Sequence, residues 1–262
     1  MPLEPLADRG FGSRAEAYEQ ARPGWPSEVV EELVRELGVS LESTVVDLAA
    51  GTGKLTRQLV ERAGRVIAVE PSAAMRNKLA AIVEAADPLD GTADAMPLPD
   101  ASADAVFIAE AFHWFATGEA VTEIARVLRP GGGLALLWNV HAWHGDEPSL
   151  AEVGKLVAAR RAAGETREER LHSGRWREPF EGSAGELFEP FHEIEVEHRQ
   201  VVDLEGLLLH MSTWSFISAL DDGERESLLA EARAVLEREL PDPDRVVIPY
   251  RTVAHWTRRR AG

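Results

Sequence analysis

The stretch Val45-Val46-Asp47-Leu48-Ala49-Ala50-Gly51-Thr52-Gly53 decides the fold of this chain. An apolar run ends in an acidic residue, passes through small residues into a Gly-Thr-Gly turn, and is followed by the amphipathic segment 54–60. This order predicts a buried strand at 44–49, a tight turn, and a helix at 53–62. Small residues let the backbone approach a ligand closely, and the N–H groups at a helix start can bind it.

A second apolar run, Val66-Ile67-Ala68-Val69, ends in Glu70. In a nucleotide-type site, a carboxylate at this place accepts hydrogen bonds from both ribose hydroxyls. The turn and this carboxylate together predict that the protein binds a molecule that contains adenosine.

Two phosphate-binding motifs fit the turn poorly. A P-loop would need glycine at Leu48 and Ser or Thr at Leu55, although Gly53-Lys54 matches its end. The dinucleotide pattern Gly-x-Gly-x-x-Gly would need its third glycine at Thr56. The third interpretation is S-adenosyl-L-methionine, which has no phosphate and needs a turn for its methionyl part and a ribose carboxylate.

Several landmarks follow one another in the order typical of class I S-adenosylmethionine-dependent methyltransferases. They are the loop 47–53, Glu70, the adenine-side segment 91–100, the strand-like segment 104–109 and the helix end and turn 127–132. The chain resembles this family over roughly residues 40 to 140. Phe112-His113-Trp114-Phe115 and the opening segment 11–26 are most similar to its small-molecule branch around trans-aconitate methyltransferase.

The resemblance implies an α/β fold with a Rossmann-like, seven-stranded, mostly parallel sheet. Helices would cover both faces, the last strand would be antiparallel, and helical cap segments would lie over the carboxyl ends of the strands. The implied cofactor is S-adenosyl-L-methionine, with S-adenosyl-L-homocysteine as the product.

One position departs from the family pattern. Ala49 stands where the family usually has the first glycine of the loop. Its carbonyl can still accept a hydrogen bond from the methionyl ammonium. Because alanine disfavours positive φ, we expect the turn to form without a positive φ at Ala49.

The resemblance assigns cofactor contacts to residues at the ends of the predicted strands. In that assignment Asp94 accepts from the adenine amino group, Ala95 offers its backbone N–H, Met75 packs on the adenine face, and Tyr18 closes with Arg22 over the methionyl carboxylate. The full predicted set is Tyr18, Asp47, Ala49, Gly51, Gly53, Glu70, Pro71, Met75, Asp94, Ala95 and Glu110. Structural alternatives stay open: Asp47 can cap the turn, Glu70 can be a helix-start acid, Asp94 a turn residue and Met75 a core residue. Tyr18 and Arg22 can be ordinary surface residues.

His113 is the candidate catalytic residue, because it follows the predicted fourth strand and an imidazole can take a proton near neutral pH. The alternative is that it belongs to a packing cluster with its aromatic neighbours. Trp114, Trp143 and Trp214 are candidates for an apolar substrate pocket, or for packing within the cap. We expect no metal, because the spacing of His141, His144 and Asp146 brings fewer carboxylates than metal-dependent methyltransferases use.

Composition narrows the function classes. The 262 residues are 45% hydrophobic, which supports a sizeable core, and the net charge of −17 argues against nucleic acid and anionic membrane surfaces as partners. There is no cysteine, and neither a signal peptide nor a transmembrane stretch is evident, so we expect a cytoplasmic protein. Only three of the 28 basic residues are lysines, which indicates a GC-rich bacterial genome.

The pattern along the chain predicts one methyltransferase domain over residues 1–262. We expect an N-terminal lid at 1–26, a cofactor-binding core at 27–140, helical cap segments at 141–190 and 203–240, and edge strands at 191–202 and 246–256. Further strands are expected at 65–70, 89–93, 104–109 and 133–139, and helices from Ser27 to Gly38 and at 72–82, 118–128, 149–163, 204–220 and 224–240.

We therefore predict methyl transfer to a small molecule, with an oxygen, nitrogen or carbon acceptor and a carboxylate among the options. Two alternatives remain: a nicotinamide-dependent oxidoreductase, and a cofactor-binding homologue without turnover. The sequence sets neither the acceptor nor the oligomeric state.

Overall fold

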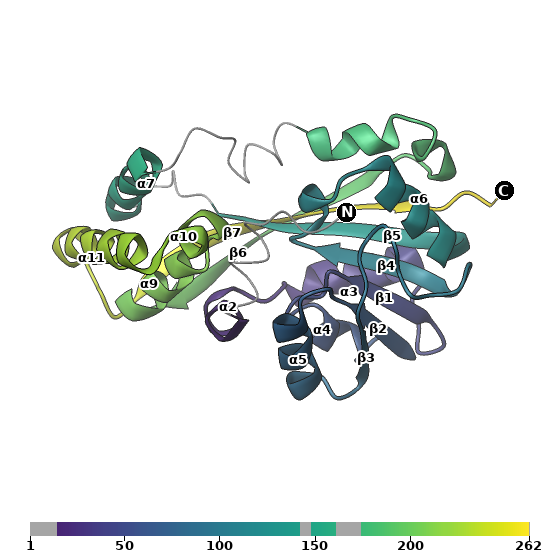
Figure 1. The fold of residues 1–262 in the computed structure, drawn as a ribbon, viewed down its shortest axis with the longest axis horizontal. Helices are drawn as coiled ribbons and strands as arrows, with labels where there is room; N and C mark the ends of the chain where they lie inside the picture. Colours follow the sequence, from purple (N-terminus) through teal and green to yellow (C-terminus); the bar gives the residue numbers. More distant parts are fainter. Residues whose placement is uncertain (1–14, 142–147, 161–173, 262) are drawn as a thin grey trace.

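A computed structural model describes residues 15–141, 148–160 and 174–261 of the chain. Its centre is a seven-stranded sheet in the order β3-β2-β1-β4-β5-β7-β6 (Figure 1). The strands are β1 (Thr44–Leu48), β2 (Arg65–Val69), β3 (Ala86–Leu89), β4 (Ala103–Ala109), β5 (Leu128–His141), β6 (His192–Val202) and β7 (Val246–Arg258). The first five run parallel, while β7 pairs antiparallel with both β5 and β6. The predicted fold class is confirmed.

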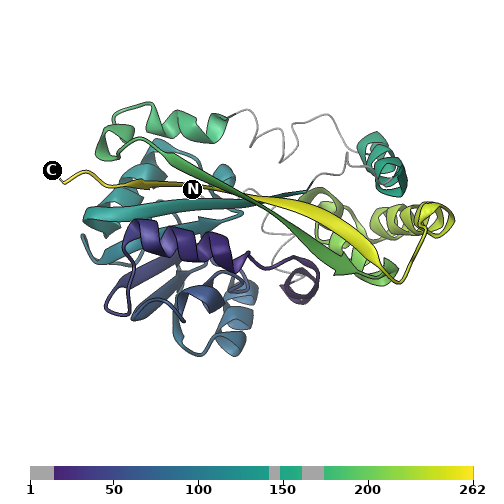
Figure 2. The ribbon, with the colours of Figure 1, turned by 180° about the vertical axis from the view of Figure 1, so that it is seen from behind.

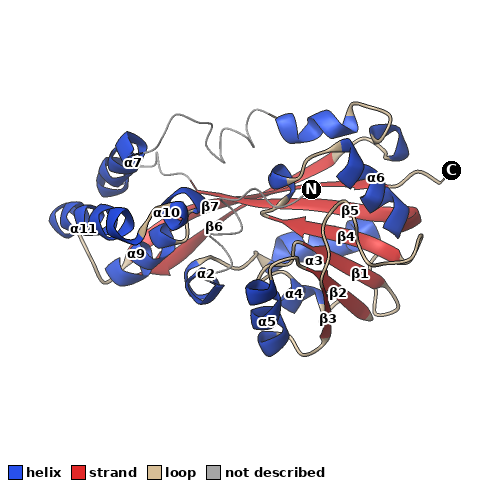
Figure 3. Cartoon of the chain, in the orientation of Figure 1, coloured by secondary structure: helices blue, strands red, loops and turns tan. Residues whose placement is uncertain are grey.

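Helices cover both faces of the sheet, as Figures 2 and 3 show. They are α2 (Ala15–Ala21), α3 (Ser27–Leu37), α4 (Thr56–Leu59), α5 (Ala73–Ile82), α6 (Gly118–Val127), α7 (Pro148–Arg160), α9 (Leu204–Ser212), α10 (Ser215–Ala219) and α11 (Asp222–Glu239), with 3-10 turns η1 (Phe112–Trp114), η2 (Arg175–Phe180) and η3 (Gly185–Leu187). Consecutive residues of a strand point to opposite faces of the sheet: Val45 packs with α3 and α4, whereas Val46 packs with α6. Such alternation follows from the two-residue period of a strand.

Three predicted elements differ from the structure. The helix after β1 spans only Thr56–Leu59, because the turn continues to residue 55, and β3 lies at Ala86–Leu89 instead of 89–93. The single helix predicted at 204–220 is wrong, since α9 and α10 are separate. The Thr213 hydroxyl donates to the carbonyl of His210 (2.6 Å) and Trp214 is extended, so a side-chain bond competes with the helix there.

Four helices form a second packing centre beyond the parallel strands. Figure 1 shows α7, α9, α10 and α11 together where β6 and β7 extend past the rest of the sheet. Their apolar side chains pack on the ends of these strands, with Met211, Leu228, Ile248 and Tyr250 buried together. Tyr250 pairs with His141 at the carboxyl end of β5, so this centre borders the edge at which ligands bind in such sheets.

No helix within the described ranges combines the length and the apolar character needed to cross a membrane.

Candidate active site

Two adjoining cavities lie at the carboxyl ends of the parallel strands. The larger encloses about 1040 Å³ of empty space, part of it open to solvent, and the smaller about 540 Å³. They share Ala49, Pro71, Trp114 and Phe115 in their walls. Of the predicted site residues, the larger is lined by Tyr18, Ala49, Gly51, Glu70, Pro71, Met75, Glu110 and Trp114, and the smaller by Ala49, Pro71, Asp94 and Trp114.

The loop after β1 turns through three residues with positive φ: Ala49 at 57°, Gly51 at 58° and Gly53 at 87°. The expectation that Ala49 avoids this conformation is therefore wrong. Its backbone N–H donates to the carbonyl of Val69 (2.7 Å), as does that of Ala50 (3.2 Å), and this pair of bonds holds the chain in the turn. A side chain at Gly53 would place its Cβ 2.9 Å from Leu79, so this glycine serves packing against α5 rather than the cavity wall.

Glu70 lies at the cavity wall, directly after β2. Its two carboxylate oxygens accept hydrogen bonds from the backbone N–H groups of Gly51 (2.9 Å) and Ser72 (2.8 Å). Burial raises the pKa of Glu70, and these backbone bonds oppose the shift. The carboxylate is thus fixed between the turn after β1 and the start of α5.

Asp47 is buried beneath the loop and is not among the residues that line either cavity. Its Oδ2 accepts a hydrogen bond from the hydroxyl of Thr56 (2.6 Å), while its Oδ1 accepts none from any described residue. Burial raises the pKa of Asp47 to about 7, and the nearby charge of Glu70 adds to the shift. A cationic group bound at the loop would favour the charged carboxylate.

The smaller cavity contains the predicted adenine side. Asp94 lines it and accepts a hydrogen bond from the Thr92 hydroxyl (2.7 Å). Ala95 is exposed, and its N–H donates to the carbonyl of Thr92 (3.2 Å). The N–H group of Ala95, which was predicted to contact the cofactor, therefore donates within the turn instead. Met75 is buried and lines the larger cavity beside Glu70 and Pro71.

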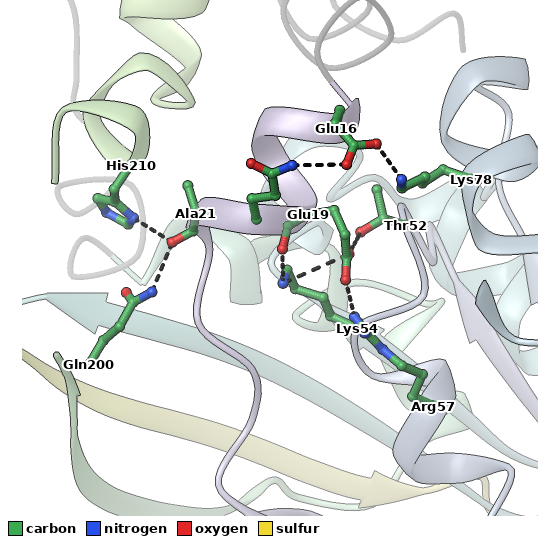
Figure 4. A network of polar contacts seen from close by, with 10 residues as sticks. Glu16, Glu19, Ala21, Thr52, Lys54, Arg57, Lys78, Gln200 and His210 are labelled. Carbon is green, nitrogen blue, oxygen red and sulfur yellow. Dashed lines mark hydrogen bonds and ion pairs between the residues drawn. The ribbon is translucent and has the colours of Figure 1, made fainter. Parts of the chain in front are cut away.

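Helix α2 contributes Tyr18 to the wall of the larger cavity and is held by contacts on two sides (Figure 4). On the core side, Glu19 accepts from the Thr52 hydroxyl (2.6 Å) and pairs with Arg57 (2.5 Å), and its carbonyl accepts from Lys54 (2.6 Å). On the other side, the carbonyl of Ala21 accepts from Gln200. Lys54 is half-buried, and burial lowers its pKa.

Arg22 follows α2 and presents a cation to the larger cavity. Its guanidinium donates to the hydroxyl (2.9 Å) and carbonyl (3.1 Å) of Thr213, and lies 5.6 Å from the ring centre of Tyr18. The break between α9 and α10 thus supplies the partner that positions this arginine.

Hydrogen-bonded polar residues lie at the carboxyl ends of β4 and β5. Glu110 has φ of 63°, and its side chain accepts from the backbone N–H of Asn139 (2.7 Å). Asn139 is buried, and its side-chain oxygen accepts from the Thr252 hydroxyl (2.6 Å). A non-glycine residue in this strained conformation at a cavity wall is typical of a functional position.

His113 is not among the residues that line either cavity. Its Nδ1 accepts a hydrogen bond from the buried indole of Trp138 (3.1 Å), and its ring lies 4.9 Å from that of Trp114. Trp214 is likewise outside both linings and lies beside His210. Trp143, His144 and Asp146 fall outside the described residues, within which no cluster suited to a metal ion occurs.

Sequence reasoning missed several wall residues, among them Trp25, Asn139 and Tyr250. Asn139 ends a predicted strand, and that position was the signal available for it. Trp25 and Tyr250 carry no local signal, because they reach the cavity from chain segments that tertiary packing brings in. Together with Tyr18, Trp114 and Phe115 they give the larger cavity an aromatic wall.

The residues present fit S-adenosylmethionine. Glu70 at the wall suits ribose hydroxyls, the smaller cavity with Asp94 suits adenine, and the loop over Asp47 with Arg22 beyond suits an amino acid group. The buried Oδ1 of Asp47, without a donor among the described residues, lies beneath this loop, where the positive charge of a bound amino acid group would favour the charged carboxylate.

Comparisons with known proteins point to methyltransferases. Residues 46–136 match the methyltransferase domain family model. An uncharacterised methyltransferase-like protein of Schizosaccharomyces pombe is 31% identical over 254 residues, 96% of each chain. An uncharacterised methyltransferase of Mycobacterium tuberculosis is 47% identical over 129 residues, 49% of this chain; the match spans about half (51%) of that relative's length.

Among solved structures, one described as a putative type II methyltransferase from Anaeromyxobacter dehalogenans superposes on this chain with a TM-score of 0.64 at 25% identity. The match covers 92% of this chain and 97% of that one. The family match, the relative that covers nearly the whole chain and the solved structure agree: the chain belongs to the class I S-adenosylmethionine-dependent methyltransferases.

Proposed function

We propose that the protein transfers a methyl group from S-adenosylmethionine to a small organic molecule by in-line displacement. The observation that carries the proposal is the pair of adjoining cavities. The larger is lined by Glu70, by residues 49–52 of the turn and by an aromatic wall, and the smaller contains Asp94. The acceptor atom is oxygen, nitrogen or carbon, and a carboxylate is among the options.

The cofactor would be held by residues that follow β1, β2 and β3 and by the lid. Glu70 binds the ribose, Asp94 and Met75 face the adenine, Ala49 and Gly51 form the turn around the methionyl part, and Tyr18 with Arg22 covers its carboxylate. Pro71 and Trp114, which line both cavities, would lie between the adenine and the rest of the cofactor.

The bound cofactor supplies a methyl group on a positively charged sulfur, which is already a good leaving group. The chain therefore acts mainly by positioning and by excluding water. Helix α2 closes the cavity, and Trp25, Phe115 and Tyr250 provide apolar surface for the acceptor. A carboxylate acceptor would need no base, whereas an acceptor that carries a proton would.

A small acceptor suits both the cavity and the charge of the chain. A net charge of −17 disfavours nucleic acid and anionic lipid surfaces, in keeping with a cytoplasmic bacterial enzyme. In this proposal residues 15–26 act as the lid, 27–140 as the cofactor-binding core, and the helices within 203–240 as the cap of the acceptor site, with 191–202 and 246–256 as edge strands.

Isothermal titration calorimetry tests the cofactor directly. S-adenosylhomocysteine should bind with a Kd in roughly the micromolar range or tighter, and NADH should not bind. Heat from NADH alone would support the oxidoreductase alternative. Binding of S-adenosylhomocysteine without methyl transfer to any member of a broad compound library would favour a homologue without turnover.

A further inference from the structure

We propose that Tyr250 and His210 form a proton-accepting pair in the acceptor site, and that the acceptor is an aromatic hydroxyl compound. The inference rests on the proposed function and assigns chemistry to two residues that the sequence analysis did not identify. Tyr250 lines the larger cavity from β7, and His210 lies behind it on α9.

The hydrogen bonds of His210 set its tautomer. Its Nδ1 lies 3.2 Å from the carbonyl oxygen of Ala21, and its Nε2 lies 3.2 Å from the hydroxyl of Tyr250. A carbonyl only accepts, so Nδ1 carries the hydrogen and Nε2 accepts from Tyr250. His210 is fully buried and Tyr250 is 3% exposed, so the pair is shielded from bulk water.

Gln200 supports this arrangement. Its side-chain N–H group donates to the same carbonyl of Ala21 (3.0 Å), which directs its oxygen toward the Tyr250 hydroxyl (3.3 Å). The single hydroxyl hydrogen of Tyr250 therefore has two acceptors, Nε2 of His210 and the side-chain oxygen of Gln200, and is donated to one of them at a time. A phenolic oxygen that donates its hydrogen to either acceptor keeps lone pairs with which it can accept a hydrogen bond from a bound molecule.

Helix α2 links this pair to closure of the site. The carbonyl of Ala21, the last residue of α2, receives the bonds from both His210 and Gln200 (Figure 4). When α2 covers the cofactor, its end therefore also fixes the imidazole in the tautomer that can take a proton.

The acceptor O–H bond breaks, its proton passes to the Tyr250 oxygen, and the Tyr250 proton passes to Nε2 of His210. The electron pair of the acceptor oxygen forms the new bond to the methyl carbon, and the pair of the broken carbon–sulfur bond stays on sulfur. His210 ends as an imidazolium and later releases its proton to water. An aromatic acceptor is specified because Trp25, Trp114, Phe115 and Tyr18 also face this cavity.

The test uses two phenols of different acidity, 4-methylphenol and 4-nitrophenol, with the full-length protein in mildly alkaline buffer. 4-Nitrophenol is largely ionised there and needs no base, whereas 4-methylphenol does. Tyr250→Phe and His210→Gln should each lower methyl transfer to 4-methylphenol by roughly a hundredfold, with a much smaller effect on 4-nitrophenol. If His210→Gln folds poorly, Tyr250→Phe still provides the test, because it keeps the aromatic ring and its packing.

Binding provides a second readout. In protein saturated with S-adenosylhomocysteine, Tyr250→Phe should weaken 4-methylphenol binding by roughly fivefold to tenfold in calorimetry. His192→Gln, at an exposed position on β6, is the matched control and should change nothing. Equal losses for both phenols would mean a structural role and overturn the pair. If S-adenosylhomocysteine binds but neither phenol does, the inference fails while the proposed function stands; if S-adenosylhomocysteine does not bind, the proposed function itself fails.

Discussion

The carboxylate of Glu70, at the end of β2, accepts a hydrogen bond from the backbone N–H of Gly51 in the loop after β1 (2.9 Å). The two segments that the sequence analysis singled out are thus joined directly. One residue therefore orders the cofactor turn and, in the proposed function, binds the ribose.

Glu70→Ala should weaken S-adenosylhomocysteine binding by roughly 1.5–3 kcal/mol, because two charge-assisted bonds to the ribose are lost. Calorimetry measures the change. Asp87→Asn, at an exposed carboxylate on the neighbouring strand β3, is the control and should leave the affinity intact. Unchanged affinity in a Glu70→Ala protein with normal melting would mean that Glu70 serves only the turn and the helix start.

Ala49→Gly should stabilise the protein by about 0.5–1 kcal/mol. Glycine removes the conformational cost of alanine at a φ of 57°, and this gain exceeds the cost of the extra chain entropy that glycine loses on folding. Urea unfolding of the cofactor-free protein measures the difference. Ala50→Gly, one residue along and without positive φ, should be neutral or destabilising. If both substitutions have the same effect, strain at Ala49 does not limit stability.

Asp47→Asn should flatten the dependence of stability on pH. The folded pKa of about 7 lies above the ordinary value of 3.8, so the folded state holds this proton more tightly than the unfolded state. The stability that Asp47 contributes is therefore complete below about pH 4 and lost as pH rises toward 7. Over that range, the free energy of unfolding of the asparagine variant should fall by roughly 1–3 kcal/mol less than that of the wild type.

Urea unfolding across the same pH range provides the measurement for Asp47. The exposed Asp87→Asn variant should follow the wild-type profile. Parallel profiles for wild type and Asp47→Asn would show that the buried carboxyl keeps an ordinary pKa.

Glu19→Gln should speed dissociation of S-adenosylhomocysteine and weaken its binding by roughly tenfold, because the bonds that Glu19 accepts from Thr52 and Arg57 hold α2 over the cofactor loop. Stopped-flow fluorescence can follow release, since Trp25 and Trp114 line the cavity. Glu16→Gln, on the same helix but exposed, should have little effect. Similar rates for the two variants would contradict a closing role for Glu19.

His113→Ala should lower the free energy of unfolding by roughly 1–3 kcal/mol, because the buried indole N–H of Trp138 loses its acceptor. Cofactor affinity should stay nearly the same. Thermal melting and calorimetry separate these effects, with exposed His192→Ala as the control. Normal stability combined with a hundredfold slower chemical step would instead assign the base to His113.

The sequence by itself determined the cofactor class and most of the fold. The turn 47–53 and Glu70 are local patterns, in which the residue types dictate a strand end, a tight turn and a helix start. Alternation of strands and helices then leaves few topologies, because parallel connections are right-handed and short. The order of the seven strands and the antiparallel β7 follow the family pattern.

Only the tertiary structure decided how the remaining walls of the site are built. Ala21, His210 and Tyr250 meet across separations of 189 and 40 residues, and no local pattern encodes such a contact. The same holds for Arg22, which is positioned by Thr213 at an unpredicted helix break. Ala49 adopts a conformation that alanine disfavours because bonds to Val69 hold it there. Propensity and periodicity describe what neighbours in the chain prefer, whereas these features depend on packing between segments that are distant in sequence.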